Sequence, residues 1–167
     1  MKQEEMHVEH LFAPIYDKDS RIFILGTFPS VKSRENHFYY GHPQNRFWKV
    51  IAALTASEVP MTIEDKKILL LSHHIAIWDV IASCDITGSS DSSIRNVVPT
   101  DLSVIMKEAA IRQIYANGNT AAKLYHRYQE KTLERNIVGL PSTSPANAAF
   151  SLERLTEQWK CIREYLI

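Results

Sequence analysis

The segment spanning residues 21–54, RIFILGTFPSVKSRENHFYYGHPQNRFWKVIAAL, constrains the fold of this chain more than any other. Its apolar run at 21–25 predicts a short buried strand that stops at Gly26. A turn is predicted at 27–30, because proline fixes its own φ and favours extended geometry in the residue before it. After a polar loop, apolar side chains at helical spacing predict a helix over residues 43–54.

The rest of the chain alternates predicted strands with predicted helices. Strands are expected at 75–81, 111–116 and 135–140, and helices at 63–72, 102–110, 121–128 and 152–165. This alternation is typical of a mostly parallel sheet covered on both faces by helices. A length of 167 residues suits one domain with a sizeable core, so a single domain over residues 1–167 is expected.

Two segments lack a periodic pattern. Residues 1–20 are interpreted as an N-terminal arm that leads into the first strand. Residues 84–99, CDITGSSDSSIRNVVP, are predicted to form a long loop without regular structure. Such loops are uncommon inside compact domains and are often functional, although a disordered surface insertion is the alternative.

Composition limits the location and the partners of the protein. Lys+Arg and Asp+Glu both number 19, which argues against a surface coated in basic residues but leaves room for a local basic face. No apolar run approaches the roughly 20 residues that span a bilayer, and the polar N-terminus is unlike a signal peptide. Cys84 and Cys161 are read as reduced thiols, so we expect a cytoplasmic protein without a membrane or structural zinc.

Three predicted strand-end loops, at 26–45, 117–120 and 141–147, carry Asn or Ser beside Gly or Pro. Ligands of open α/β sheets bind at the carboxyl ends of strands. The loops contain no phosphate-binding glycine motif, no nucleophile–base pair and no pair of carboxylates. Neutral polar side chains with nearby aromatics suit a neutral heterocycle, whereas the alternative is an ordinary crossover loop whose aromatics cap the core.

The ordered motifs GTFPS, YYGHPQNRFW and LPSTSPAN resemble the uracil-DNA glycosylase superfamily, and within it the hypoxanthine-DNA (deoxyinosine) glycosylase family. The HPxNRFW part is also similar to the mismatch-specific uracil/thymine glycosylases. The segments IAIWDVIASCDITGSSDSSI and YANGNTAAKLY fit the deoxyinosine family too, so the resemblance covers nearly the whole chain. It implies a three-layer α/β/α fold with a short four-stranded parallel sheet. It also implies hydrolysis of the N-glycosidic bond of a damaged base in DNA, without a metal or cofactor.

The resemblance assigns the catalytic task to Asn45. Many superfamily members place Asp or Asn in the first turn, where this chain has Phe28, which cannot activate water. An amide is a poor general base, so we expect Asn45 to orient a water through its carbonyl oxygen. The base would then leave through a transition state that resembles an oxocarbenium ion. The alternative for Asn45 is a hydrogen bond to backbone at the start of a helix.

Base-binding residues follow from the same motifs. Tyr40 occupies the place of an aromatic that stacks on the flipped base, a contact worth roughly 1–3 kcal/mol, or else it is a core tyrosine. Asn117 can pair with the adjacent acceptor and donor of hypoxanthine or uracil, or else it only forms the turn before the next helix. The backbone amides of the first turn are expected to face the polar edge of the base; the turn residues concerned are Gly26, Thr27 and Phe28.

Two departures from the superfamily pattern concern the last loop. Ser142 stands where the archetypal uracil enzymes carry a catalytic histidine, so stabilisation of the departing anion should be weaker. Ala146 and Asn147 stand where relatives insert a wedge into the duplex, and alanine is too small to fill the gap. Base flipping costs least at mispairs, so mispaired or single-stranded sites should be favoured.

A DNA face is expected around the first loop. DNA phosphates need positive partners, and only Glu35 opposes the basic residues there. The expected phosphate contacts are the cations Lys32, Arg34, Arg46 and Lys49 and the hydroxyls of Ser30 and Ser144. The alternative is that these charges are solvated surface groups.

The sequence therefore predicts a monomeric, monofunctional DNA glycosylase acting on deoxyinosine, with DNA containing a deaminated base as its partner. One alternative keeps the chemistry and changes the base to uracil or to several deaminated bases. The other is a catalytically inactive module that binds nucleic acid or nucleosides.

Overall fold

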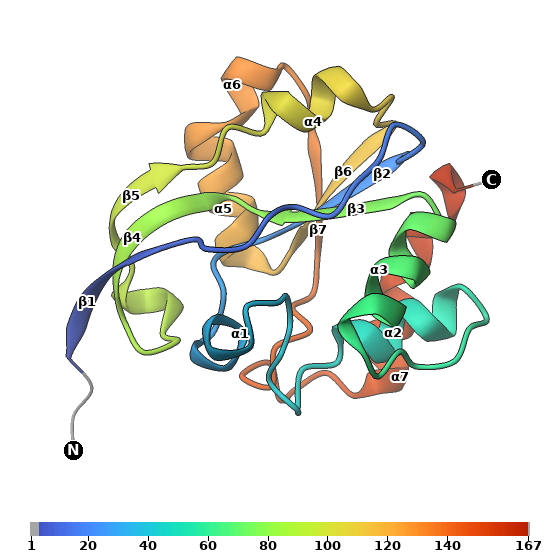
Figure 1. The fold of residues 1–167 in the computed structure, drawn as a ribbon, viewed down its shortest axis with the longest axis horizontal. Helices are drawn as coiled ribbons and strands as arrows, with labels where there is room; N and C mark the ends of the chain where they lie inside the picture. The colour runs from blue at the N-terminus through green and yellow to red at the C-terminus, as the bar shows by residue number, and fades with distance from the viewer. Residues whose placement is uncertain (1–3, 167) are drawn as a thin grey trace.

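The computed structural model describes residues 4–166 and contains two sheets (Figure 1). The larger sheet has four parallel strands in the order β3-β2-β6-β7. Its strands are β2 (Ile22–Gly26), β3 (Ile75–Asp79), β6 (Gln113–Asn117) and β7 (Ile137–Leu140). The predicted α/β fold with a short four-stranded parallel sheet is therefore confirmed.

Helices cover both faces of this sheet (Figure 1). Side chains alternate along β2, with Ile22 and Ile24 in one core and Phe23 and Leu25 in the other, because successive strand residues point to opposite faces. One face is covered by α2 (Phe47–Leu54), α3 (Ile63–Ser72), α7 (Leu152–Trp159) and the 3₁₀ helix η2 (Lys160–Tyr165). The other is covered by α4 (Ser103–Glu108), α5 (Asn119–Tyr128) and α6 (Glu130–Leu133).

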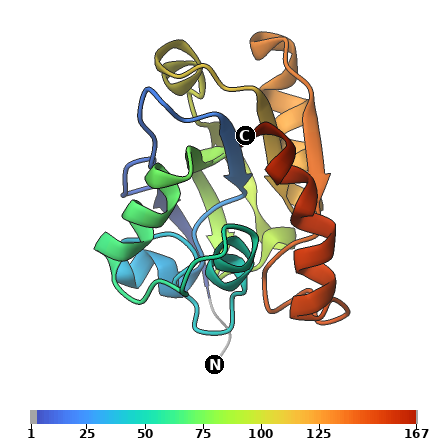
Figure 2. The same cartoon turned by 90° about the vertical axis from the view of Figure 1, so that its right-hand side faces the viewer.

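The parallel register brings four strand ends to one edge. Gly26 of β2 lies opposite Asp79 of β3, and Asn117 of β6 lies opposite Leu140 of β7. On the face beside this edge, α2 and α7 lie side by side, with the rings of Phe47 and Trp159 6.0 Å apart (Figure 2). The loops that leave the four strands therefore meet at one place.

The smaller sheet corrects two predictions. Residues 84–99 are not a structureless loop, because β4 (Ile81–Thr87) and β5 (Arg95–Pro99) form an antiparallel hairpin with the short helix η1 (Asp91–Ser93) at its tip. The N-terminal arm contains β1 (Glu5–Glu9), which pairs antiparallel with β4. The few apolar residues of the hairpin pack into the core on the α5 side of the parallel sheet, which the polar composition of the segment obscured.

Other boundaries also differ from the prediction. The helix expected at 43–54 begins at Phe47, and a short helix α1 (Val31–Asn36) occupies the expected polar loop. The strand expected at 75–81 ends at Asp79, and the chain then turns into β4. The helix expected at 152–165 is α-helical through Trp159 and continues as a 3₁₀ helix.

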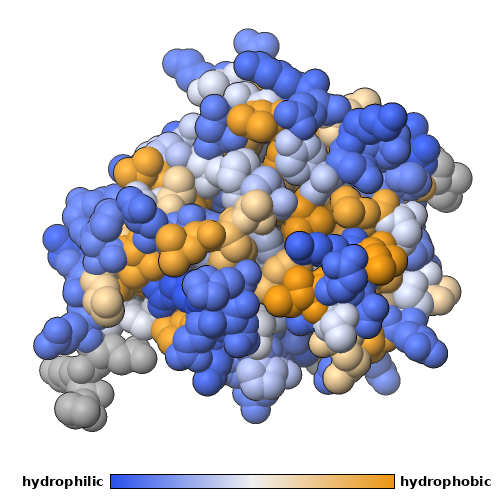
Figure 3. Space-filling view, viewed as in Figure 1, coloured by the Kyte–Doolittle hydropathy of each residue, from blue (hydrophilic) through white to orange (hydrophobic). Residues whose placement is uncertain are grey.

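Hydrophilic side chains dominate the face in Figure 3, with hydrophobic ones gathered across its middle. None of the helices within residues 4–166 is long and apolar enough to cross a bilayer.

Candidate active site

A cavity of about 360 Å³ lies at the carboxyl ends of the parallel strands. All three strand-end loops that the sequence singled out contribute to its walls, through the turn 26–30, Asn117 and the loop 142–146. Tyr40 and Asn45 line it as well. Two contributors were not predicted, namely Asp79 at the end of β3 and the tip of the β4–β5 hairpin, residues 89–92.

The turn after β2 is tight because Gly26 has no side chain. A Cβ on Gly26 would overlap Oδ1 of Asp79 and would stand 3.0 Å from the Tyr40 hydroxyl oxygen. The Gly26 and Thr27 carbonyls accept hydrogen bonds from the backbone N–H groups of residues 80 and 81, which fixes the turn to the start of β4. Phe28 is half-buried, with the Arg34 guanidinium 5.9 Å from its ring centre.

Asn45 lines the cavity just before α2, and its side chain is held on two sides. Its Oδ1 accepts hydrogen bonds from the Phe47 backbone N–H at 2.9 Å and from the Thr143 hydroxyl at 2.9 Å. The helix-start bond that the sequence left as an alternative is therefore present. A backbone N–H can only donate, so this contact also fixes which end of the amide is oxygen. Both lone pairs of Oδ1 are engaged, which makes Nδ2 the available end of the side chain.

Thr143 joins two of the predicted site residues, although the sequence analysis gave it no role. It is fully buried, its backbone N–H donates to Oδ1 of Asn117, and its hydroxyl accepts from Nδ2 of Asn117, both at 3.0 Å. The same hydroxyl donates to Asn45, so the end of β6 is connected to the start of α2. The only sequence signal was a β-branched residue between two serines in PSTSPAN.

Tyr40 combines features of a core residue and of a cavity residue. One face of its ring is stacked on Phe47, with 4.0 Å between centroids and 23° between planes. Its backbone has a φ of +52°, which is uncommon for a residue other than glycine. Its hydroxyl is buried without a hydrogen-bond partner among residues 4–166. Burial raises the pKa of this phenol, and the charge of Asp79 raises it further.

Beneath the cavity lies a buried pair that the sequence analysis missed. Nε2 of His10 is 2.8 Å from Oδ2 of Asp79, and both side chains are only 5% exposed. His10 follows β1 in the N-terminal arm, and Asp79 ends an apolar strand. A lone acidic residue after IAIW was the available signal, but its partner lies 69 positions away in the sequence.

The residues predicted to contact DNA divide into two groups. Lys32 and Lys49 are exposed, and Lys32 pairs with Glu35 at 3.3 Å. The guanidinium groups instead hold loops together: Arg34 donates to the Gly88 carbonyl at the hairpin, at 2.6 Å. Arg46 donates to three carbonyls of the last loop, those of Ser144, Asn147 and Phe150.

Hydroxyls and amides of the predicted DNA face are also used within the protein. Ser30 caps α1, accepting from the Ser33 N–H at 3.1 Å. In the last loop, Ser142 Oγ accepts from the Ser144 N–H, and Ser144 Oγ accepts from the Ala146 N–H. The Asn147 side chain donates to the Ser142 carbonyl at 3.0 Å, so it is folded back along the loop.

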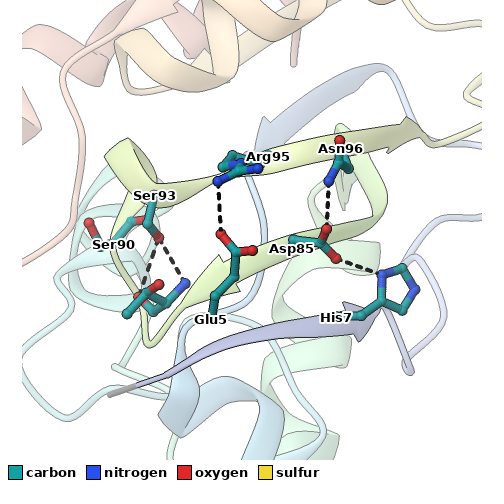
Figure 4. A network of polar contacts seen from close by, with 8 residues as sticks. Glu5, His7, Asp85, Ser90, Ser93, Arg95 and Asn96 are labelled. Atoms are coloured by element: carbon teal, nitrogen blue, oxygen red, sulfur yellow. Dashed lines mark hydrogen bonds and ion pairs between the residues drawn. The ribbon is translucent and has the colours of Figure 1, made fainter. Parts of the chain in front are cut away.

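The hairpin tip forms the remaining wall. Ser89 Oγ accepts from the backbone N–H of Val31 at 2.8 Å, which fixes the tip to α1. Asp91 lines the cavity, and partial burial raises the pKa of its carboxyl, as does the charge of Asp79. Away from the cavity, the smaller sheet carries an exposed network of polar side chains (Figure 4). In it, Oδ2 of Asp85 accepts a hydrogen bond from Nδ2 of Asn96 at 2.7 Å, and Oδ1 of Asp85 lies 2.9 Å from Nδ1 of His7.

The chain is similar in sequence to known DNA glycosylases. Residues 13–165 match the uracil DNA glycosylase superfamily. A hypoxanthine DNA glycosylase of Methanosarcina acetivorans is 31% identical over 153 residues, which cover 90% of this chain and 95% of the relative. A hypoxanthine DNA glycosylase of Methanosarcina barkeri is 27% identical over 138 residues, which cover 81% and 86%.

The fold is shared with a solved structure. A solution NMR structure of a Methanosarcina acetivorans protein, described as a candidate uracil DNA glycosylase, superposes with a TM-score of 0.80. The two sequences are 29% identical, and the match covers 99% of each chain. The family match over residues 13–165, together with this shared fold, establishes that the chain belongs to the uracil DNA glycosylase superfamily and is a DNA glycosylase.

Proposed function

We propose that this DNA glycosylase releases hypoxanthine from deoxyinosine in DNA. The observation that carries the proposal is the fixed amide of Asn45 at the wall of a polar cavity. Two relatives that share most of the chain are hypoxanthine DNA glycosylases, which supports the choice of base.

The reaction is a hydrolysis at C1′ of the flipped nucleotide. The bond from C1′ to N9 breaks, and its electron pair leaves with the base. A water oxygen bonds to C1′ and passes a proton to solvent, which leaves an abasic site. Because the transition state resembles an oxocarbenium ion, the water needs placement more than deprotonation.

Asn45 supplies that placement. With both lone pairs of Oδ1 engaged, Nδ2 donates to one lone pair of the water and leaves the other for C1′. This differs from the expected contact through the carbonyl oxygen, which would require the Thr143 hydroxyl to turn away. In either arrangement Asn45 is the catalytic residue.

The base is held by the residues around Asn45. Tyr40 stacks on it with the ring face that Phe47 does not cover. Asn117 retains one amide hydrogen and one lone pair beyond its bonds to Thr143, and we keep it as a base contact. The remaining proposed contacts are the turn residues Gly26, Thr27 and Phe28, and Ser142, all of which line the cavity.

The DNA backbone passes over the cavity mouth. Exposed Lys32 contacts phosphate directly, whereas Arg34 and Arg46 act by fixing the loops that surround the base. The other proposed contacts are Ser30, Ser144, Ala146 and Asn147. Ala146 is exposed at the cavity and leaves the flipped base's gap largely unfilled, so we expect mispaired or single-stranded sites to be preferred.

Base release is tested on oligonucleotide duplexes that each carry one hypoxanthine or one uracil. Alkaline cleavage after incubation reports the abasic site. We expect cleavage at hypoxanthine; strong uracil release without hypoxanthine release would move the specificity to the second candidate, which the candidate uracil DNA glycosylase of the same fold supports. No cleavage of either duplex would favour a binding module.

A further inference from the structure

The floor of the cavity holds a carboxylate oxygen, Oδ1 of Asp79, that accepts no hydrogen bond from the described residues. The hydrogen bonds found among residues 4–166 engage Oδ2 of Asp79, through His10, and leave Oδ1 beside Gly26. The hydroxyl of Tyr40 lies near the same point and has no hydrogen-bond partner among residues 4–166. Both residues line the cavity. Asp79 lines the cavity, so an acceptor there that no residue among 4–166 uses is available to a ligand.

The chemistry of deamination defines what such an acceptor recognises. Adenine and cytosine present a ring nitrogen acceptor beside an amino group. Deamination replaces that arrangement with a ring N–H beside a carbonyl, in hypoxanthine and in uracil alike. An ionised carboxylate can only accept hydrogen bonds, so it binds the ring N–H and repels the lone pair of an undamaged adenine or cytosine.

We propose that Asp79 is the specificity-determining residue of the site, with Oδ1 accepting the ring N–H of the deaminated base. This inference rests on the proposed function and deepens it. Asn117 discriminates less than Asp79, because an amide offers a donor and an acceptor and is already bonded to Thr143.

His10 is a positioning residue in this arrangement. Its contact with Oδ2 at 2.8 Å determines which oxygen of Asp79 faces the cavity.

The test uses single-turnover rates on duplexes that carry hypoxanthine or 1-deazahypoxanthine, whose keto form has a C–H in place of the N1–H and carries the displaced proton on N3. We compare wild type with Asp79→Asn and with Asp85→Asn, a matched aspartate that also pairs with a histidine but lies on the outer sheet (Figure 4). For wild type, the ratio of the hypoxanthine rate to the 1-deazahypoxanthine rate should exceed the ratio for nonenzymatic hydrolysis by about 10- to 100-fold. This preference should disappear in Asp79→Asn and persist in Asp85→Asn.

Several results would overturn the proposal. One is a folded Asp79→Asn protein that keeps the wild-type preference, with folding measured by thermal unfolding. Another is a wild-type preference equal to the nonenzymatic ratio, a comparison that needs no variant. If wild type releases uracil and not hypoxanthine, the proposed function fails by itself. The role of Asp79 is then decided in the same way with uracil and 3-methyluracil, in which a methyl group replaces the N3 hydrogen.

Discussion

Residues 4–166 contain two histidine–aspartate pairs with nearly equal contact distances and very different surroundings. His10 and Asp79 lie 2.8 Å apart beneath the cavity, with both side chains 5% exposed. His7 and Asp85 lie 2.9 Å apart on the outer sheet, where the His7 side chain is 60% exposed (Figure 4). Contact distance alone would give them the same role, so burial and neighbouring groups must distinguish them.

The difference in burial has an energetic meaning. Removing charged groups from water is costly, and a buried pair is often no more stabilising than an apolar replacement. An exposed pair costs little and contributes little, because solvent screens it. A buried pair at the floor of a cavity, with one oxygen unused, is therefore better explained by function than by stability.

The largest effect should come from breaking the buried pair. Asp79→Ala leaves His10 buried without its partner, and we expect a loss of about 3 kcal/mol in the free energy of unfolding. Asp85→Ala should cost much less, because its partner is exposed. Urea unfolding measures the free energy of unfolding of both variants, and equal losses would contradict the claim that burial distinguishes the two pairs.

A smaller change at the same place tests the geometry of the floor. Gly26→Ala adds a Cβ that overlaps Oδ1 of Asp79, so the carboxylate must move away from the turn. We expect about 1–3 kcal/mol of destabilisation from this overpacking, together with slower base release. Gly139→Ala is the control, because a Cβ there has no neighbour within 4 Å. Unchanged stability and activity in Gly26→Ala would show that the floor is not close-packed.

The polar chain above the floor should be sensitive to loss of one hydroxyl. Thr143→Val keeps the shape of the side chain but removes the hydroxyl's bonds to Asn45 and Asn117, at an expected cost of about 1–3 kcal/mol. Thr156→Val is the matched control, since the Thr156 hydroxyl binds only its own helix on an exposed surface. Thermal unfolding measures the loss of stability in each variant, and equal changes in melting temperature would mean that the buried hydrogen bonds of Thr143 add no more stability than the bond of Thr156.

The smallest expected effect is the loss of stability at low pH from the exposed His7–Asp85 pair. Hydrogen bonds from Asn96, and then from His7, hold the pKa of Asp85 below its ordinary value of about 4. A depressed pKa in the folded state stabilises the protein above the unfolded pKa, and this contribution is lost as the pH falls through the folded one. Wild type should therefore lose its small advantage over Asp85→Asn below about pH 4, as followed by urea unfolding between pH 7 and pH 3. A stability difference between wild type and Asp85→Asn that stays constant from pH 7 to pH 3 would contradict the lowered pKa of Asp85.

The sequence predicted the parallel sheet well because each strand is a short apolar run bounded by turn residues. The helix at 63–72 was also placed correctly, because its acidic residues Glu64 and Asp65 lie in the first turn, where they favour the helix dipole. The hairpin at 81–99 was missed because its apolar residues are few and its tip is rich in serine. Pairing with β1, more than 70 positions earlier, gives it a regular structure that local composition does not reveal.

The site shows the same limit. Motif resemblance brought Asn45, Tyr40 and Asn117 to attention, and all three line one cavity. The bonds made by Thr143 and the His10–Asp79 pair join residues far apart in the chain. No spacing rule connects such partners, so only the folded structure reveals which polar atoms are engaged and which remain for a ligand.

The most direct test of the central claim is base release from a deoxyinosine duplex by wild type and Asn45→Ala. Asn136→Ala is the control, because Asn136 is exposed and far from the cavity lining. We predict cleavage by wild type and Asn136→Ala, and a rate about 100-fold lower or more in Asn45→Ala, with duplex binding retained. Equal rates in wild type and a folded Asn45→Ala protein would contradict the assignment of Asn45 as the catalytic residue.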